Sequence, residues 1–233
     1  AANVNTIAGA TSGVVTATIT TGAVSSTLSA ITNVNVSDVI TFTTNDTSVD
    51  ASDLVDLDVK IDTSDYTSVT TITEAYDTAS VTTEVTNALG LLDGNEAVEI
   101  TGGALSAANV NTIAGATSGV VTATVTSDTA SNLASNLSNA TSSDALSLTV
   151  TNVATDAADL ITLNGKTNQQ IDVTAITSTI NGDASELIDV YVTNVAQYNG
   201  LGNEAVTVDN SSSASDVNTI AGATSGVVTA TVT

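Results

Sequence analysis

Short runs in which apolar residues alternate with threonine or serine recur along the whole chain. The run ALSLTVTN at 145–152, for example, places leucine or valine at every second position. A strand with one buried face and one wet face requires this period of two. The pattern predicts nine strands, at residues 13–20, 38–45, 65–73, 96–101, 119–126, 145–152, 170–177, 204–209 and 226–233.

Between these runs, the sequence shows short segments with helical spacing and recognisable helix starts. The clearest are Asp50 with Asp53, Asp156 with Asp159, and Asp183 with Glu186, each acidic pair standing three residues apart before leucines. The first side chain of such a pair can accept from free backbone amides, and the second places negative charge at the positive end of the helix. Weaker starts stand at Ser106, Ser127, Thr78 and Ser213, and glycines suited to a left-handed helix end stand at 9, 115, 165 and 222.

The spacing of the predicted strands indicates how they pair. Successive strands start 22 to 34 residues apart, which is too long for hairpins and suits a strand, a turn, a short helix and a return. We therefore expect an α/β repeat fold, a right-handed parallel solenoid of about nine strand-plus-short-helix coils. In it, a continuous aliphatic ladder runs from Val15, Ala17 and Ile19 over Ile40 and Phe42 to Val98 and Ile100, and on through Val121, Ala123, Val125, Leu146, Leu148 and Val150.

A long internal repeat sets the domain organisation. Residues 1–18 return letter for letter at 107–124, and residues 110–126 return at 217–233. We expect a first long repeat at 1–106, a second at 107–213 and the start of a third at 214–233, all within one continuous solenoid. Two compact α/β domains of about 106 residues are the alternative, but no linker rich in proline or in glycine and serine separates the repeats.

The composition of the chain disfavours several classes of function and of binding partner. Lys and Arg total 2 against 25 acidic residues, a net charge of −23, which disfavours nucleic acid and anionic membrane surfaces as partners. No run approaches the roughly 18 apolar residues of a membrane span. The chain has no Cys and no His, so it lacks the commonest catalytic base, the thiol nucleophile and the usual transition-metal ligands. We expect no enzyme activity and no cofactor, and an extracellular or cell-surface location. A carbohydrate-active enzyme would need aromatic platforms beside paired carboxylates, and the chain has 5 aromatic residues.

Three stretches carry a resemblance to known proteins. They are ADLITLNGKTNQQIDVTAITSTINGDASEL at 158–187, NTIAGATSGVVTATV at 111–125 and GLGNEAVTV at 200–208. Their repeat pattern, which covers nearly the whole chain, resembles repeat regions of giant surface or secreted proteins of marine cyanobacteria. The resemblance implies an extracellular structural or adhesive array, and it supplies no catalytic residue.

The densest group of acidic residues is the one place where calcium is worth considering, since oxygen ligands suit this ion. Its spacing matches no known calcium loop, and we expect Asp50 and Asp53 to be helix-cap residues and the others to lie in solvated turns. We therefore assign no catalytic, cofactor-binding or metal-binding residue, and calcium remains an open alternative. The group consists of Asp46, Asp50, Asp53, Asp56, Asp58, Asp62 and Asp65.

Outward threonine pairs give the main alternative function. If they stack, they form a flat grid like the ice-binding face of solenoid antifreeze proteins, although Glu99, Ile176 and Asp209 interrupt it. Threonine is also simply a good exposed strand residue. The pairs are Thr16 and Thr18, Thr41 and Thr43, Thr71 and Thr73, Thr122 and Thr124, Thr149 and Thr151, and Thr229 and Thr231.

The two lysines of the chain occupy equivalent positions in the long repeat. Lys60 and Lys166 stand 106 residues apart, and we expect each to pair with a carboxylate of the next coil rather than to act as a nucleophile.

Both ends, 1–20 and 214–233, are near-copies of an interior coil, so we expect end-to-end self-association or covalent continuation of the array. The favoured function is a structural or adhesive repeat protein of a surface fibre or filament.

Overall fold

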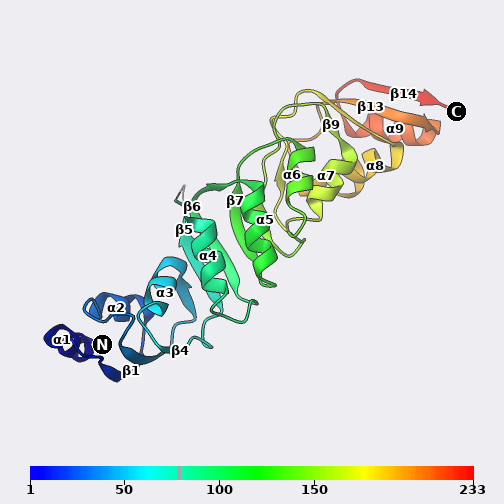
Figure 1. The fold of residues 1–233 in the computed structure, drawn as a ribbon. Helices are drawn as coiled ribbons and strands as arrows, with labels where there is room; N and C mark the ends of the chain where they lie inside the picture. Colours follow the sequence, from blue (N-terminus) through cyan, green and yellow to red (C-terminus); the bar gives the residue numbers. More distant parts are fainter. Residues whose placement is uncertain (78–79) are drawn as a thin grey trace. The chain divides into compact units, whose positions relative to one another are not determined.

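The computed structural model describes residues 1–77 and 80–233, and it has an α/β fold with parallel strands (Figure 1). Its contacts divide the chain into two compact units. Unit 1 comprises Ala1–Gly103 with Ile113–Thr122, and unit 2 comprises Ala104–Thr112 with Ala123–Thr233.

The helices of the described residues are short, as the sequence predicts. They are α1 (Ala2–Ala10), α2 (Val24–Ala30), α3 (Ala51–Asp58), α4 (Val81–Leu89), α5 (Ala107–Ala116), α6 (Ala130–Asn136), α7 (Ala157–Asn164), α8 (Ala184–Ile188), a π-helical turn at Asp189–Thr193, a 3₁₀ turn at Val195–Gln197, and α9 (Ala214–Ala223). Within unit 1, α3 packs beside α2 and α4, and within unit 2, α7 packs beside α6 and α8.

The strands are more numerous than predicted and most are shorter, although β6 and β13 are longer. They are β1 (Thr16–Gly22), β2 (Val39–Thr44), β3 (Ser48–Asp50), β4 (Thr63–Asp65), β5 (Thr71–Ala75), β6 (Ala97–Leu105), β7 (Val121–Val125), β8 (Ala145–Ser147), β9 (Thr155–Asp156), β10 (Ile171–Asp172), β11 (Thr179–Gly182), β12 (Tyr198–Asn199), β13 (Ala205–Ser212) and β14 (Val228–Val232).

In unit 1 the strands form two parallel sheets, in the orders β1-β2-β4 and β3-β5-β6. Hydrogen bonds between neighbouring strands and turns join residues about 20 to 28 positions apart. The chain therefore returns beside itself once in every such stretch, and we call each stretch a coil. Two of these coils, β2-β3-α3 and β4-β5-α4, contain two short strands separated by a bend and then a helix, whereas β1 and β6 each lead directly to a helix.

Unit 2 repeats this arrangement with shorter strands. Strands β9, β11, β13 and β14 form one parallel sheet in the order β14-β13-β11-β9, and β10 pairs with β12. The predicted strand at 170–177 shrinks to Ile171–Asp172, because the carboxylate of Asp172 accepts from both the amide and the hydroxyl of Thr174 and turns the chain. The next strand, Thr179–Gly182, was not predicted.

The aliphatic ladder is confirmed locally but is not continuous. Ala17 lies beside Ile40 and Ile19 beside Phe42, as the alternation predicts. Phe42, however, lies beside Ser64, whereas Val98 lies beside Ile72 in the other sheet of unit 1. The expected step from Phe42 to Val98 is therefore wrong, because a bend after β2 sends the chain into a second sheet. Each fully buried aliphatic side chain contributes about 1.5–3 kcal/mol wherever it lies.

Most of the predicted helix starts are confirmed. Asp50 caps α3 by accepting from the amide of Asp53, Asp156 caps α7, and Ser213 caps α9. Asp183 and Glu186 form a full capping box on α8. Ser106 accepts from the amide of Asn109 at the start of α5.

Other predictions for the helix ends need correction. Thr129, not Ser127, caps α6 by accepting from the amide of Asn132, and Thr78 lies outside the described residues. The four glycines at 9, 115, 165 and 222 are not left-handed, since positive φ occurs among the described glycines at 94, 102, 200 and 202. Helices α1 and α9 instead end in an extended threonine, Thr11 or Thr224, whose hydroxyl accepts from a glycine amide two residues on.

Candidate functional site

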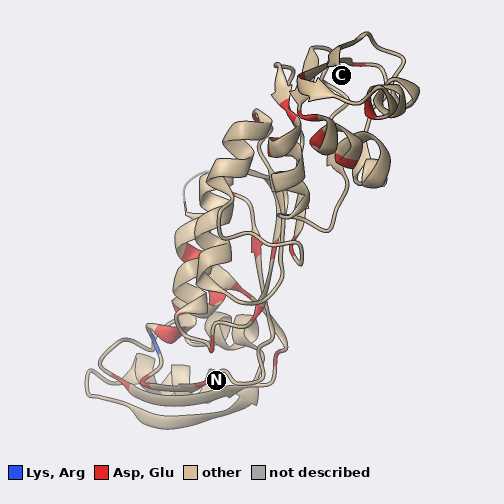
Figure 2. Cartoon of the chain, turned by 90° about the vertical axis from the view of Figure 1, so that its right-hand side faces the viewer, with Lys and Arg blue, Asp and Glu red and all other residues tan. Residues whose placement is uncertain are grey.

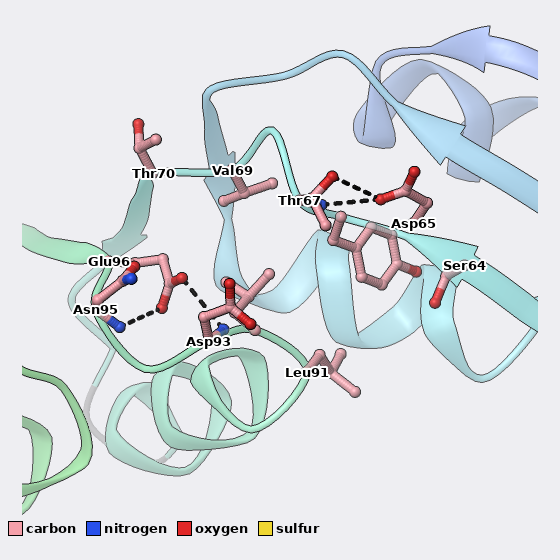
Figure 3. A pocket seen from close by; sticks show the side chains of 11 residues that line it. Ser64, Asp65, Thr67, Val69, Thr70, Leu91, Asp93, Asn95 and Glu96 are labelled. Carbon is pink, nitrogen blue, oxygen red and sulfur yellow. Dashed lines mark hydrogen bonds between the residues drawn. The ribbon is translucent and has the colours of Figure 1, made fainter.

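A hollow of about 410 Å³ in unit 1 is the most site-like feature of the described surface (Figure 3). It lies between the end of β4 with the turn after it, residues 64–70, and the loop that joins α4 to β6, residues 91–96. The two turns face each other because they belong to successive coils. Their side chains are mostly polar, with Val69, Leu91 and Leu92 as aliphatic neighbours.

Two carboxylates of this hollow, those of Asp65 and Glu96, are already engaged in shaping its walls. The carboxylate of Asp65 accepts from the amide of Thr67 at 3.1 Å and from its hydroxyl at 2.8 Å. These two bonds hold the pKa of Asp65 below its usual value, since they favour the charged form. Asp65 is therefore a turn-forming carboxylate and is a weaker base than a free aspartate.

Glu96 is committed in the same way. Its side chain is only 3 % exposed and accepts from the amides of Asp93, Gly94 and Asn95, at 3.3, 3.0 and 3.1 Å. A buried carboxylate is tolerated here because three donors replace its hydration. Its role is to hold the loop before β6 in place.

Tyr66 is the aromatic residue that lines the hollow, but its ring is buried. It is 5 % exposed, and its hydroxyl donates to Asp58 at 3.3 Å. Burial, with a smaller contribution from Asp58, raises its pKa to about 12. The hydroxyl is therefore neutral near pH 7, and the ring is not available to stack on a sugar.

The expected acidic group is separated into local contacts. Asp50 is the predicted cap of α3, Asp46 accepts from the amide of Val24 at 2.8 Å, and Asp58 accepts from Tyr66. Partial burial, then the charges of Asp50 and Asp56, raise the pKa of Asp53 in the first turn of α3. Within the described residues, no three acidic side chains come together in a way that could hold a metal ion. Acidic residues lie on helices and strands alike (Figure 2).

The threonine pairs are brought together only in part. Thr18, Thr41 and Thr63 lie side by side across β1, β2 and β4. Their partners leave this row, because Thr16 lies beside Val39 and Thr43 beside Asp65. Thr71 and Thr73 belong to the second sheet of unit 1, where Thr73 lies beside Glu99. The row in the first sheet is one threonine wide.

Lys166 makes a contact with a neighbouring coil, although not the expected one. Its ammonium donates to the backbone carbonyl of Ser138, at 3.2 Å, and not to a carboxylate. The contact is exposed, so it contributes little to stability.

A contact that sequence reasoning missed recurs once in each unit. In unit 1 the hydroxyl of Thr117 donates to the carbonyl of Glu96 at 2.6 Å, and the amide of Ser118 donates to the carbonyl of Gly94 at 2.8 Å. A Cβ placed on Gly119 would lie 2.7 Å from the carbonyl oxygen of Asn95 and still closer to that of Glu96. Only glycine therefore allows the two backbones to approach.

Unit 2 reproduces these contacts with the same residue types. Thr224 donates to the carbonyl of Glu204 at 3.0 Å, and the amide of Ser225 donates to that of Gly202 at 2.7 Å. A Cβ on Gly226 would lie 2.9 Å from the amide of Ala205 and closer still to Glu204. We call this arrangement the Thr-Ser-Gly contact. Its signal in the sequence is the recurrence of Gly-Asn-Glu-Ala-Val, at 94–98 and 202–206, before each later Thr-Ser-Gly.

A second contact between coils also recurs. The side-chain oxygen of Asn5 accepts from the amide of Asn33 at 2.6 Å in unit 1, and Asn111 accepts from the amide of Asn139 at 2.6 Å in unit 2. In each pair the second asparagine donates back to the carbonyl of the first, at 3.3 and 3.1 Å. We call this the asparagine contact.

Both contacts involve groups that position backbone, and neither brings a nucleophile to a base. None of the described helices is both long and apolar enough to cross a membrane. Comparison of the chain with family models, curated proteins and solved structures finds no match.

Proposed function

We propose that the chain is a segment of an extracellular structural or adhesive repeat protein that forms part of a surface fibre. Its coils stack as a right-handed parallel solenoid, and the array lengthens by covalent continuation or by end-to-end association. The observation that carries this proposal is the recurrence, with the same atoms, of the Thr-Ser-Gly contact and the asparagine contact in both units. A contact that repeats between successive coils is the requirement for a stacked array, because each coil then needs only its neighbours.

The chemistry of the surface supports a role without catalysis. In the hollow of unit 1, the carboxylates of Asp65 and Glu96 are used by Thr67 and by backbone amides, and Tyr66 is buried and neutral. A net charge of −23 keeps separate arrays apart in dilute salt and lets them approach where salt screens the charge. Such a surface suits a medium of high ionic strength outside the cell.

Surface labelling tests this function directly. Antibodies raised against the purified chain should label intact cells that carry this sequence, along filaments or patches at the cell boundary. Permeabilised cells from the same culture serve as the control. Label that appears only after permeabilisation would contradict the proposal.

A further inference from the structure

The Thr-Ser-Gly motif occurs three times in the chain, and two of the copies are occupied. Thr117–Gly119 and Thr224–Gly226 each lie on a Gly-Asn-Glu turn of the preceding coil. The third copy, Thr11–Gly13, has the same residues and the same internal bond, in which the amide of Gly13 donates to the hydroxyl of Thr11 at 3.0 Å. Within the described residues, the one atom near a Cβ on Gly13 would be the hydroxyl oxygen of Thr11 itself, at 3.5 Å.

The strand that follows the first copy is open on the corresponding edge. In the occupied copies, the carbonyls of Val120 and Val227 accept from the amides of Val98 and Val206, at 2.9 and 2.8 Å. The described residues give the equivalent residue of the first copy, Val14, no such bond, and β1 is the end strand of its sheet, in the order β1-β2-β4. The other edge of β1 is paired with β2. The surface from Thr11 to Ile19 is therefore an unpaired edge of a parallel sheet, and it already carries the Thr-Ser-Gly half of the Thr-Ser-Gly contact.

We propose that this surface, Thr11–Ile19, is a docking site for a coil that carries a Gly-Asn-Glu turn followed by a strand of the type at 97–101. The occupant would present the carbonyl of the glutamate to the hydroxyl of Thr11 and the carbonyl of the glycine to the amide of Ser12. It would also place its backbone against Gly13, where any side chain would block the approach.

The chemistry of the occupant follows from the two occupied copies. The glycine of each turn is left-handed, with φ of +74° at Gly94 and +118° at Gly202, so another residue there is strained. The glutamate side chain folds back on the turn: in each copy it accepts from the amides of the glycine and the asparagine before it. A strand that lacks this turn cannot present the two carbonyls together. The site therefore discriminates by backbone shape and not by charge.

A folded second copy of this chain does not satisfy the site by simple contact. Its Gly94–Glu96 turn is already covered by Thr117–Gly119, and its Gly202–Glu204 turn by Thr224–Gly226. The partner is therefore a coil whose Gly-Asn-Glu turn is open. This inference rests on the proposed function only in its view that the chain works by stacking coils.

The first test uses a synthetic peptide of residues 92–105, LDGNEAVEITGGAL, added to the full 233-residue chain. We expect saturable binding, followed by shifts in the backbone amide resonances of residues 11–19. Gly13→Ala should weaken binding more than about tenfold, because a Cβ blocks the approach of the peptide backbone. The same variant should have the melting temperature of the wild-type chain, since a Cβ on Gly13 meets no other part of the chain than Thr11. A peptide in which alanine replaces both Gly94 and Glu96 is the matched control.

If ordering the free peptide costs too much entropy for it to bind, a tandem chain provides the test of the docking site. Residues 1–213 joined to a complete second copy place Thr11–Gly13 of the second copy after the Gly202–Glu204 turn of the first. Gly13→Ala in the second copy should lower the melting temperature, and Gly13→Ala in the first copy should not. Equal melting of the two tandem variants, with a peptide that does not bind, would overturn the proposal.

The tests separate this inference from the proposed function. Binding without surface labelling would leave the docking site in place and remove the extracellular role. Binding that survives Gly13→Ala would mean that the peptide lies elsewhere, and would overturn the docking site whatever the location of the protein.

Discussion

Replacing Gly119 by alanine isolates the contribution of the Thr-Ser-Gly contact to stability. The added methyl would lie 2.7 Å from the carbonyl oxygen of Asn95, whereas ordinary contacts begin near 3.4 Å, so one backbone must move. Overpacking of this kind costs about 1–3 kcal/mol. The movement also weakens the bonds that Thr117 and Ser118 make to the turn, at about 1 kcal/mol each.

We therefore expect Gly119→Ala to lower the free energy of unfolding by about 3–5 kcal/mol. In a chain of this size, the melting temperature of the affected transition should fall by roughly 2–4 °C for each kcal/mol. Urea titration and thermal melting, both followed by circular dichroism, measure the loss.

Two further variants make the result specific. Gly226→Ala, the equivalent change in unit 2, should cost a similar amount, because its Cβ meets Glu204 in the same way. Gly222→Ala lies in α9 with no atom within 4 Å and should be neutral or stabilising by up to about 1 kcal/mol. If Gly119→Ala remained within about 0.5 kcal/mol of the wild type, the close approach would not be a stabilising contact, and the reasoning would fail.

Three other predictions follow from the carboxylates. Glu96→Gln should lower the free energy of unfolding by about 1 kcal/mol more than Glu204→Gln does, as measured by urea titration. The reason is that an amide nitrogen in place of Glu96 Oε1 would face the amide of Asp93, whereas Glu204 Oε1 has no partner among the described residues. Equal losses in the two variants would contradict this. Asp183→Ala should cost about 1 kcal/mol at neutral pH. Hydrogen bonds from Ser185 and Glu186 lower the pKa of Asp183, so its stabilisation is present above the unfolded pKa and is lost as the pH falls through the folded pKa. Melting curves of wild type and variant should therefore converge in acid, and a constant gap would refute the assignment. Raising sodium chloride from roughly 0.01 M to 1 M should raise the melting temperature by screening the net charge of −23. Calcium at matched ionic strength should give the same rise, and a larger rise would reveal a specific site.

The alternation of apolar and hydroxyl residues, together with the spacing of the strands and the helix starts between them, was enough to predict the parallel α/β class and the register of Ala17 with Ile40. It missed β3 and β9, because strands of three and two residues are too short to show a period. Each of them runs directly into a helix, so Asp50 and Asp156 are both the last strand residue and the helix cap. Their extended backbone serves both roles, and the acidic pattern alone indicates only the cap.

The candidate contacts were predictable only in part. The Thr-Ser-Gly motif can be read from the sequence, but what it touches depends on the register between coils. The bend after β2, which takes the chain from one sheet to another, is likewise not signalled by any single residue near Asn45 or Asp46 in the way that Asp50 signals a helix start. The engagement of Glu96 by three backbone amides is also a property of the folded turn, because the sequence offers 25 acidic residues without distinguishing which are buried.

The recurrence of the Thr-Ser-Gly contact bears on how a gene for such a protein can change. A recombination event between two copies of the repeat joins a Gly-Asn-Glu turn from one to a Thr-Ser-Gly motif from another, and the backbone geometry at the joint is the same as before. No compensating substitution is needed, since the contact depends on main-chain atoms, one hydroxyl and one absent methyl. With coils stacked as proposed, alleles that differ by whole repeats should therefore all fold, and the number of repeats can vary between strains.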